Sequence, residues 1–87
     1  MTNNSPTHSL ADFDRWLTAS WQTDQRYYQA DISRDLFGVW LLKRCWGGLG
    51  SNRGNSKTHT FTKYEDALKF FGQVAKRRQQ RGYIQVI

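Results

Sequence analysis

One short stretch combines an aromatic ring, cations and glycines in a pattern that could bind a polymer of phosphates. Residues 43–50 read Lys-Arg-Cys-Trp-Gly-Gly-Leu-Gly. The face of Trp46 could stack on a sugar or a base while the guanidinium of Arg44 meets a phosphate. A tryptophan is usually buried, so Trp46 could equally close the end of a sheet as part of the core. The residue types alone leave both interpretations open.

The other reactive side chains form no recognisable catalytic or metal-binding set. His8 and His59 have no Cys, His or carboxylate at metal-ligand spacing. Cys45 follows Arg44, but adjacent strand residues point to opposite faces, so Arg44 is badly placed to activate the thiol. The glycines from 47 to 54 lack the Gly-Lys-Ser/Thr ending of a phosphate-binding loop. We therefore expect no enzyme activity, no metal, no cofactor and no small-molecule substrate.

Basic charge is concentrated in the second part of the chain. Over 87 residues, 13 Lys and Arg against 7 Asp and Glu give a formal net charge of +6. Residues 1–36 carry a net charge of −2, whereas residues 37–87 carry +8. A strongly basic region attracts polyanions, most often nucleic acid, although many proteins are basic for solubility alone.

The composition also indicates the cellular compartment and the residues that must form the core. No run of about eighteen apolar residues is present, so we expect no membrane span. The start does not resemble an export signal, and a single cysteine cannot form an internal disulfide, so we expect a cytoplasmic protein. Hydrophobic residues make up only 38% of the chain while aromatics reach 15%, so burial must depend on large rings.

Two segments of the chain predict neighbouring strands. Tyr28, Ala30 and Ile32 alternate with polar residues, which predicts a strand beginning near residue 26. After a turn at residues 33–38, residues 39–46 are β-branched, aromatic and apolar, which is typical of a central strand. Residues two positions apart should therefore share a face of this strand, so Arg44 and Trp46 should point to the same side.

Three further segments are less distinct. Residues 13–21 fit either a helix begun by Ser9-x-x-Asp12 or a strand at about 15–21, and we favour the strand. Residues 47–56 are rich in Gly, Asn and Ser, which predicts a loop. Thr58–Phe61 and Tyr83–Ile87 could each add a short strand.

A helix is predicted after residue 61. Thr62 and Glu65 have the spacing of a capping box, in which two side chains bond the free N–H groups of the first turn. Basic residues gather at the expected helix end, and Gly82 can adopt the left-handed conformation that stops a helix. An apolar stripe follows at helical spacing: Tyr64, Ala67, Leu68, Phe71, Val74 and Ala75. The expected fold is α+β, with a small antiparallel sheet packed against one amphipathic C-terminal helix.

Several separate motifs, in the right order over roughly residues 25–83, resemble a WGR domain of the stand-alone bacterial type. They are Arg-Tyr-Tyr at 26–28, Asp-Leu-Phe-Gly-Val-Trp at 35–40, Trp-Gly-Gly-Leu-Gly at 46–50 and the basic end that closes at Tyr83. The resemblance implies a small antiparallel sheet with one helix. We expect a flexible segment at residues 1–12 and one WGR-like domain at 13–87.

The resemblance also implies a function and a site. In poly(ADP-ribose) polymerases the domain is not catalytic, contacts DNA at breaks through the motif's Trp and Arg, and touches neighbouring domains. Here Gly48 replaces that Arg, so only Trp46 and Gly47 carry over from the motif. Arg44 and Arg53 could supply the missing guanidinium, and a second basic strip could lie at the end of the helix. The strip comprises Lys76, Arg77, Arg78 and Arg81.

Sequence alone therefore favours a non-catalytic module that binds nucleic acid, with DNA preferred, through a basic surface and Trp46. The alternative is a protein–protein interaction adaptor without nucleic-acid binding. An exposed aromatic patch with scattered cations would favour the adaptor.

Overall fold

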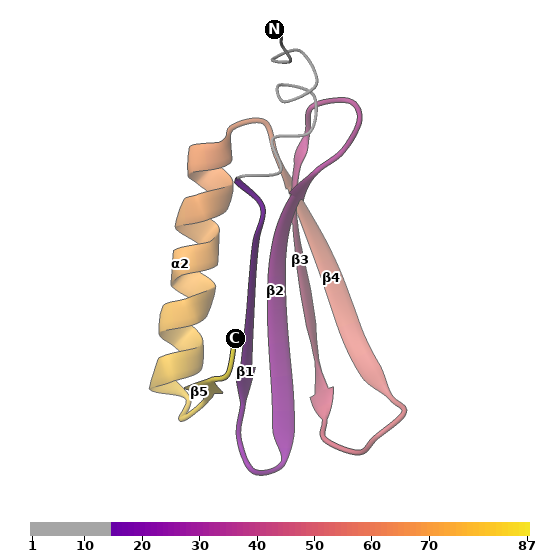
Figure 1. The fold of residues 1–87 in the computed structure, drawn as a ribbon, viewed down its shortest axis with the longest axis vertical. Coiled ribbons are helices and arrows are strands. Elements are labelled where there is room, and N and C mark those ends of the chain that lie inside the picture. Colours follow the sequence, from indigo (N-terminus) through magenta and orange to yellow (C-terminus); the bar gives the residue numbers. More distant parts are fainter. Residues whose placement is uncertain (1–14) are drawn as a thin grey trace, which may run out of the picture.

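The computed structural model describes residues 15–87 as one antiparallel sheet with a helix on one face (Figure 1). The expected flexible segment at 1–12 and the helix start at Ser9 lie outside the described residues. The sheet has the strand order β4-β3-β2-β1-β5, and every neighbouring pair is antiparallel. This arrangement confirms the predicted α+β fold. The elements are β1 (Leu17–Gln22), β2 (Arg26–Arg34), β3 (Trp40–Gly48), β4 (Gly54–Phe61), α2 (Tyr64–Gln80) and β5 (Ile84–Gln85).

The core lies between α2 and one face of the sheet, because apolar residues alternate along β1, β2 and β3. Ile32 and Leu42 are directly opposite each other and almost wholly buried. Ala67 and Val74 supply the buried positions of α2. The strand favoured at 15–21 is confirmed by β1, and a helix over Leu17–Gln22 is excluded. Within residues 15–87, no helix is long and apolar enough to cross a membrane.

The loop predicted at 47–56 is wrong at both ends, because β3 continues to Gly48 and β4 begins at Gly54. Gly47 and Gly54 are cross-strand partners. A Cβ at Gly47 would lie 3.0 Å from the Tyr27 ring, and one at Gly54 would lie 2.7 Å from the Tyr27 hydroxyl oxygen. The Tyr27 ring therefore covers the glycine pair on the face of the sheet opposite α2. Packing of an aromatic ring over cross-strand glycines compensates for their poor strand propensity.

The helix begins one residue later than the capping-box prediction required. Lys63 is the N-cap, and no side chain bonds the free N–H groups there. Instead, the Lys63 carbonyl accepts hydrogen bonds from the backbone N–H groups of Asp66 and Ala67. The predicted box of Thr62 and Glu65 is therefore wrong, because Thr62 precedes the cap position.

The apolar stripe of α2 also differs by one residue from the prediction. Leu68 is 43% exposed, whereas Phe70 packs against both core clusters. Leu68 lies at the border of the apolar stripe, and the side of α2 that carries Phe70 faces the sheet. The end of the helix is as predicted: Gly82 has φ +84°, and the Tyr83 N–H bonds the Arg78 carbonyl at 3.0 Å.

Truncation of Leu42 tests the core. Leu42→Ala should lower the free energy of unfolding by about 2–5 kcal/mol, because a buried side chain is removed and a cavity remains. Leu36→Ala is the matched control, since Leu36 is 90% exposed and its truncation should change stability by less than about 0.5 kcal/mol. Urea denaturation measures both. Equal losses in the two variants would contradict this description of the core.

Addition of one methyl group at Gly54 tests the contact with Tyr27. Gly54→Ala should destabilise the fold by about 1–3 kcal/mol through overpacking against the Tyr27 hydroxyl. The same substitution in a Tyr27→Phe background should cost less, because the closest oxygen is gone. A double-mutant cycle of unfolding free energies measures the coupling. A coupling of zero would show that the ring does not limit this position.

Candidate nucleic-acid interface

Trp46 lies on the face of β3 that also carries the core residues Trp40 and Leu42. It lies near the end of β3, is half-buried, and packs against the margin of the core. Its ring stacks on Tyr28, with ring centroids 5.8 Å apart and planes inclined by 13°. The two interpretations of Trp46 are thus compatible: the ring packs on the core and still reaches the surface.

Arg44 lies two residues before Trp46 on the same face and is held in place by rings and neutral groups. Its Nε donates to His59 Nε2 at 3.1 Å, and its Nη1 donates to the Tyr28 hydroxyl at 3.0 Å. Its guanidinium carbon is 5.4 Å from the Trp46 ring centroid and 5.9 Å from that of Phe70. A guanidinium has five N–H donors, so further donors remain for a phosphate.

His59 supports Arg44 as a neutral imidazole. Burial lowers the pKa of His59, and the positive charges of Arg44 and Lys57 lower it further. The neutral form is the one that can accept the hydrogen bond from Arg44, because Nε2 must carry a lone pair. The ring also lies against Phe70, with centroids 4.5 Å apart.

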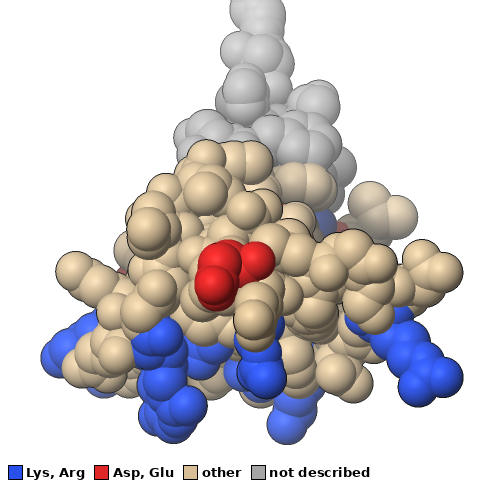
Figure 2. All heavy atoms as spheres, turned by 90° about the horizontal axis from the view of Figure 1, so that it is seen from below, with Lys and Arg blue, Asp and Glu red and all other residues tan. Residues whose placement is uncertain are grey.

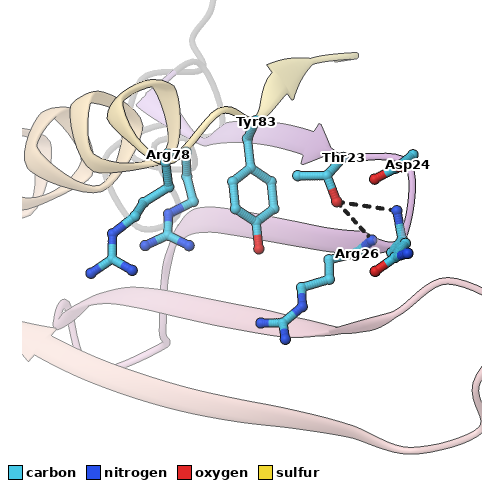
Figure 3. Close-up of a pocket in the computed structure, with 7 residues that line it drawn as sticks. Thr23, Asp24, Arg26, Arg78 and Tyr83 are labelled. Carbon is cyan, nitrogen blue, oxygen red and sulfur yellow. Dashed lines mark hydrogen bonds between the residues drawn. The ribbon is translucent and has the colours of Figure 1, made fainter.

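A second guanidinium, from Arg78 near the end of α2, reaches the same end of the sheet. Its carbon lies 4.1 Å from the Tyr28 ring centroid and 5.1 Å from that of Tyr83. Figure 3 shows Arg78, Tyr83 and Arg26 pointing to the same side, with the Tyr83 ring between the two arginines. Within residues 15–87, the buried Nε of Arg78 has no hydrogen-bond partner. Cation–π contact with the rings of Tyr28 and Tyr83 therefore holds this guanidinium in place.

Two adjoining hollows connect Trp46 with Arg78 and Tyr83, and a further hollow lies between Arg44 and Arg78. One, of about 400 Å³, is lined by Trp46, Gly48 and Asn55 together with Arg26 and Tyr83. The other, of about 380 Å³, is lined by Arg78, Arg81 and Asp24 among others, and it shares Arg26 and Tyr83 with the first. Figure 2 shows Lys and Arg side chains gathered along one side of this end of the molecule. We call Arg26, Arg44, Trp46, Arg78 and Tyr83 the Trp46 surface.

The structure distributes the predicted residues over several places. Arg77 lines a third hollow with Arg44 and Arg78, and Arg81 lines the hollow that contains Arg26. Lys76 lines a different groove, together with Trp21 and Ile84. Arg53 is exposed in the loop between β3 and β4. Gly47 lines the hollow that contains Trp46, and on the opposite face of the sheet it lies under the Tyr27 ring.

Sequence reasoning did not assign Arg26 and Tyr83 to the site. The cross-strand partner of Gly48 is Arg26, so a guanidinium stands beside the position where the WGR motif has its arginine. A Cβ at Gly48 would make only ordinary contacts, at 3.7 Å or more. Only the strand register reveals this pairing. Within residues 15–87, no three His, Cys, Asp or Glu side chains are grouped as metal ligands would be.

Comparison with known proteins identifies the family of this chain. The family model of the WGR domain matches residues 13–86. An uncharacterized protein, y4dW of Sinorhizobium fredii (strain NBRC 101917 / NGR234), is 38% identical over 58 residues. That match covers 67% of this chain but 28% of the relative, so the chain corresponds to about a quarter of that protein's length. With a match over nearly its whole length, the chain belongs to the WGR domain family.

Proposed function

We propose that this protein is a non-catalytic module that binds nucleic acid, with DNA preferred, through the Trp46 surface. The observation that carries the proposal is that a half-buried indole ring and several guanidinium groups share one end of the sheet face that carries α2. Phosphate contacts supply most non-specific affinity, and aromatic faces add sequence-tolerant stacking on bases or sugars. Membership of the WGR family is compatible with this function.

The contacts of the cations support the proposal further. Among residues 15–87, Arg44 and Arg78 contact rings, a hydroxyl and a neutral imidazole rather than carboxylates. Their positive charge is therefore not cancelled locally and remains available to an anion. Cation–π contact also reduces the conformational freedom of these long side chains before a ligand arrives, which lowers the entropic cost of binding.

Arg26 is the residue best placed to compensate for Gly48. It lines both hollows of the Trp46 surface and is exposed. We propose that its guanidinium takes the phosphate contact that the motif's arginine would make, because it projects from the neighbouring strand at the same level of the sheet.

The salt dependence of binding to a short DNA duplex tests the electrostatic part. With about four phosphates neutralised, log affinity should fall with log salt concentration at a slope of roughly −3 to −4. Arg26→Gln should reduce the steepness of that slope by about 1. Lys76→Gln removes one positive charge in a different groove and should leave the slope unchanged. Equal effects of the two substitutions, or no binding at low salt, would contradict the proposal.

In a titration of a fluorescently labelled DNA duplex, Trp46→Ala should weaken binding by about 1–3 kcal/mol, roughly fivefold to 150-fold. Circular dichroism establishes that the variant is folded, since Trp46 also packs on Tyr28.

Restoration of the motif provides a gain-of-function test. Gly48→Arg should raise DNA affinity and steepen the salt slope by about 1, because a Cβ at this position makes only ordinary van der Waals contacts and the side chain can be accommodated. Thr18→Arg is the matched control, since it adds the same charge on the exposed opposite face of β1. Quantitative gel-shift assays at two salt concentrations compare the variants. A gain of the same size in the control would mean that only net charge matters.

One observation favours the adaptor as a second candidate function. Leu36 and Phe37 are 90% and 91% exposed in the turn between β2 and β3. The Asp35 carboxylate accepts hydrogen bonds from the backbone N–H groups of Phe37 and Val39. These bonds hold the backbone of the turn in one conformation. Two fixed, exposed apolar side chains are suited to the pocket of another protein. They lie in a different part of the molecule from the Trp46 surface, so both functions can coexist.

A further inference from the structure

The outer edge of β4 is an open hydrogen-bonding edge. β4 is the last strand of the sheet and pairs only with β3 among the strands of residues 15–87. Beyond that ladder, the described part of the chain offers no backbone hydrogen bond to any residue of Gly54–Phe61. In Figure 1, α2 lies on the other side of the view from this edge and leaves it uncovered. An edge of this kind is a template for another strand.

Several features that usually protect an edge are missing from β4. The strand has eight residues, contains no proline, and pairs with β3 in an unbroken register without a bulge. Six of its residues are exposed, and Lys57 is its one formally charged side chain. The opposite edge differs, because β5 has only two residues. Self-association should therefore use β4 rather than β5.

The side chains of β4 are compatible with those of a second β4 in one particular register. Two antiparallel strands related by a twofold axis keep the same face of each sheet on the same side, so residues of equal parity must oppose each other. With Thr58 on the axis, Thr60 faces the second copy's Ser56, and hydroxyl pairs of this kind stabilise a sheet. On the other face, Lys57 then lies opposite His59, which is held neutral by burial and by Arg44.

The neighbouring registers are less favourable. An axis at Lys57 would place two ammonium groups directly opposite each other, which is destabilising. An axis at His59 or Ser56 would shorten the overlap of the two strands. The Thr58 register keeps the overlap from Asn55 to Phe61 and places no like charges directly opposite each other, the two Lys57 side chains being diagonal neighbours.

We propose that β4 pairs with β4 of a second copy of this chain, antiparallel and centred on Thr58, so that the two sheets become continuous. Both helices and both Trp46 surfaces then lie on one face of the joined sheet. The pairing does not depend on nucleic-acid binding, so the failure of either proposal leaves the other intact. One pair of seven-residue strands offers little contact compared with the roughly 1,200–2,000 Å² of standard stable interfaces, so we expect the dimer to dissociate on dilution.

Charge substitutions at the axis test the pairing. Sedimentation equilibrium of the whole chain over a concentration series should show a monomer–dimer equilibrium. Thr58→Lys and Thr58→Glu should each give a monomer, because two like charges meet on the axis. An equimolar mixture of these two variants should restore the dimer as a heterodimer. The control Thr18→Lys makes the same exchange at an exposed site on β1 and should leave dimerisation unchanged.

Disulfide trapping tests the register independently. In a Cys45→Ser background, Thr58→Cys should crosslink under mild oxidation, because directly opposite residues have Cα atoms about 4.5–5.5 Å apart, within disulfide range. Thr60→Cys is the matched control: the two Thr60 positions would be more than about 13 Å apart and should crosslink far more slowly. A monomer at every concentration, a dimer that persists in Thr58→Lys, or equal crosslinking rates at both positions would overturn the proposal.

Discussion

The structure depends on the unbroken register between β2 and β3, which runs from Arg26 opposite Gly48 to Arg34 opposite Trp40. Alternate residues of each strand face α2, so the rule that buries Ile32 and Leu42 also directs Trp46 toward that side. A shift by one residue would turn every one of these side chains to the opposite face. Core packing therefore fixes the position of the candidate interface, and no separate device is needed to orient it.

The same register explains how a small, weakly hydrophobic chain carries a cationic surface at the margin of its core. Aromatic rings connect the buried core with the cations at its margin. Tyr28 is buried, yet it contacts Trp46, Arg44 and Arg78. A ring shields its inner neighbours from water and offers a face or a hydroxyl to a cation outside. Within residues 15–87, the guanidinium groups of Arg44 and Arg78 thus gain fixed positions on rings and neutral groups rather than on carboxylates, which favours the proposed attraction of a polyanion.

Local patterns predicted what depends on local geometry. Alternation predicted β2, β3 and the shared face of Arg44 and Trp46, and Gly82 predicted the helix end. Contacts between distant segments could not be predicted in this way. The Tyr27 ring over Gly47 extends β3 and β4 into a stretch whose composition suggests a loop, and the pairing of Arg26 with Gly48 appears only in the register. The exposure of Leu68 likewise depends on which side of α2 meets the sheet.

We propose that Trp46 and its neighbouring cations form one surface that accepts nucleic acid. The most direct test is a series of ¹H–¹⁵N correlation spectra recorded at low salt while a short DNA duplex is added. If the duplex binds the Trp46 surface, the signals of the Trp46 indole N–H and of the amides of Arg26, Gly48 and Tyr83 should shift progressively. The amides of Thr18 and Leu36 should remain unchanged. Shifts confined to the opposite face of the sheet, or a spectrum unaffected by saturating duplex, would contradict the proposal.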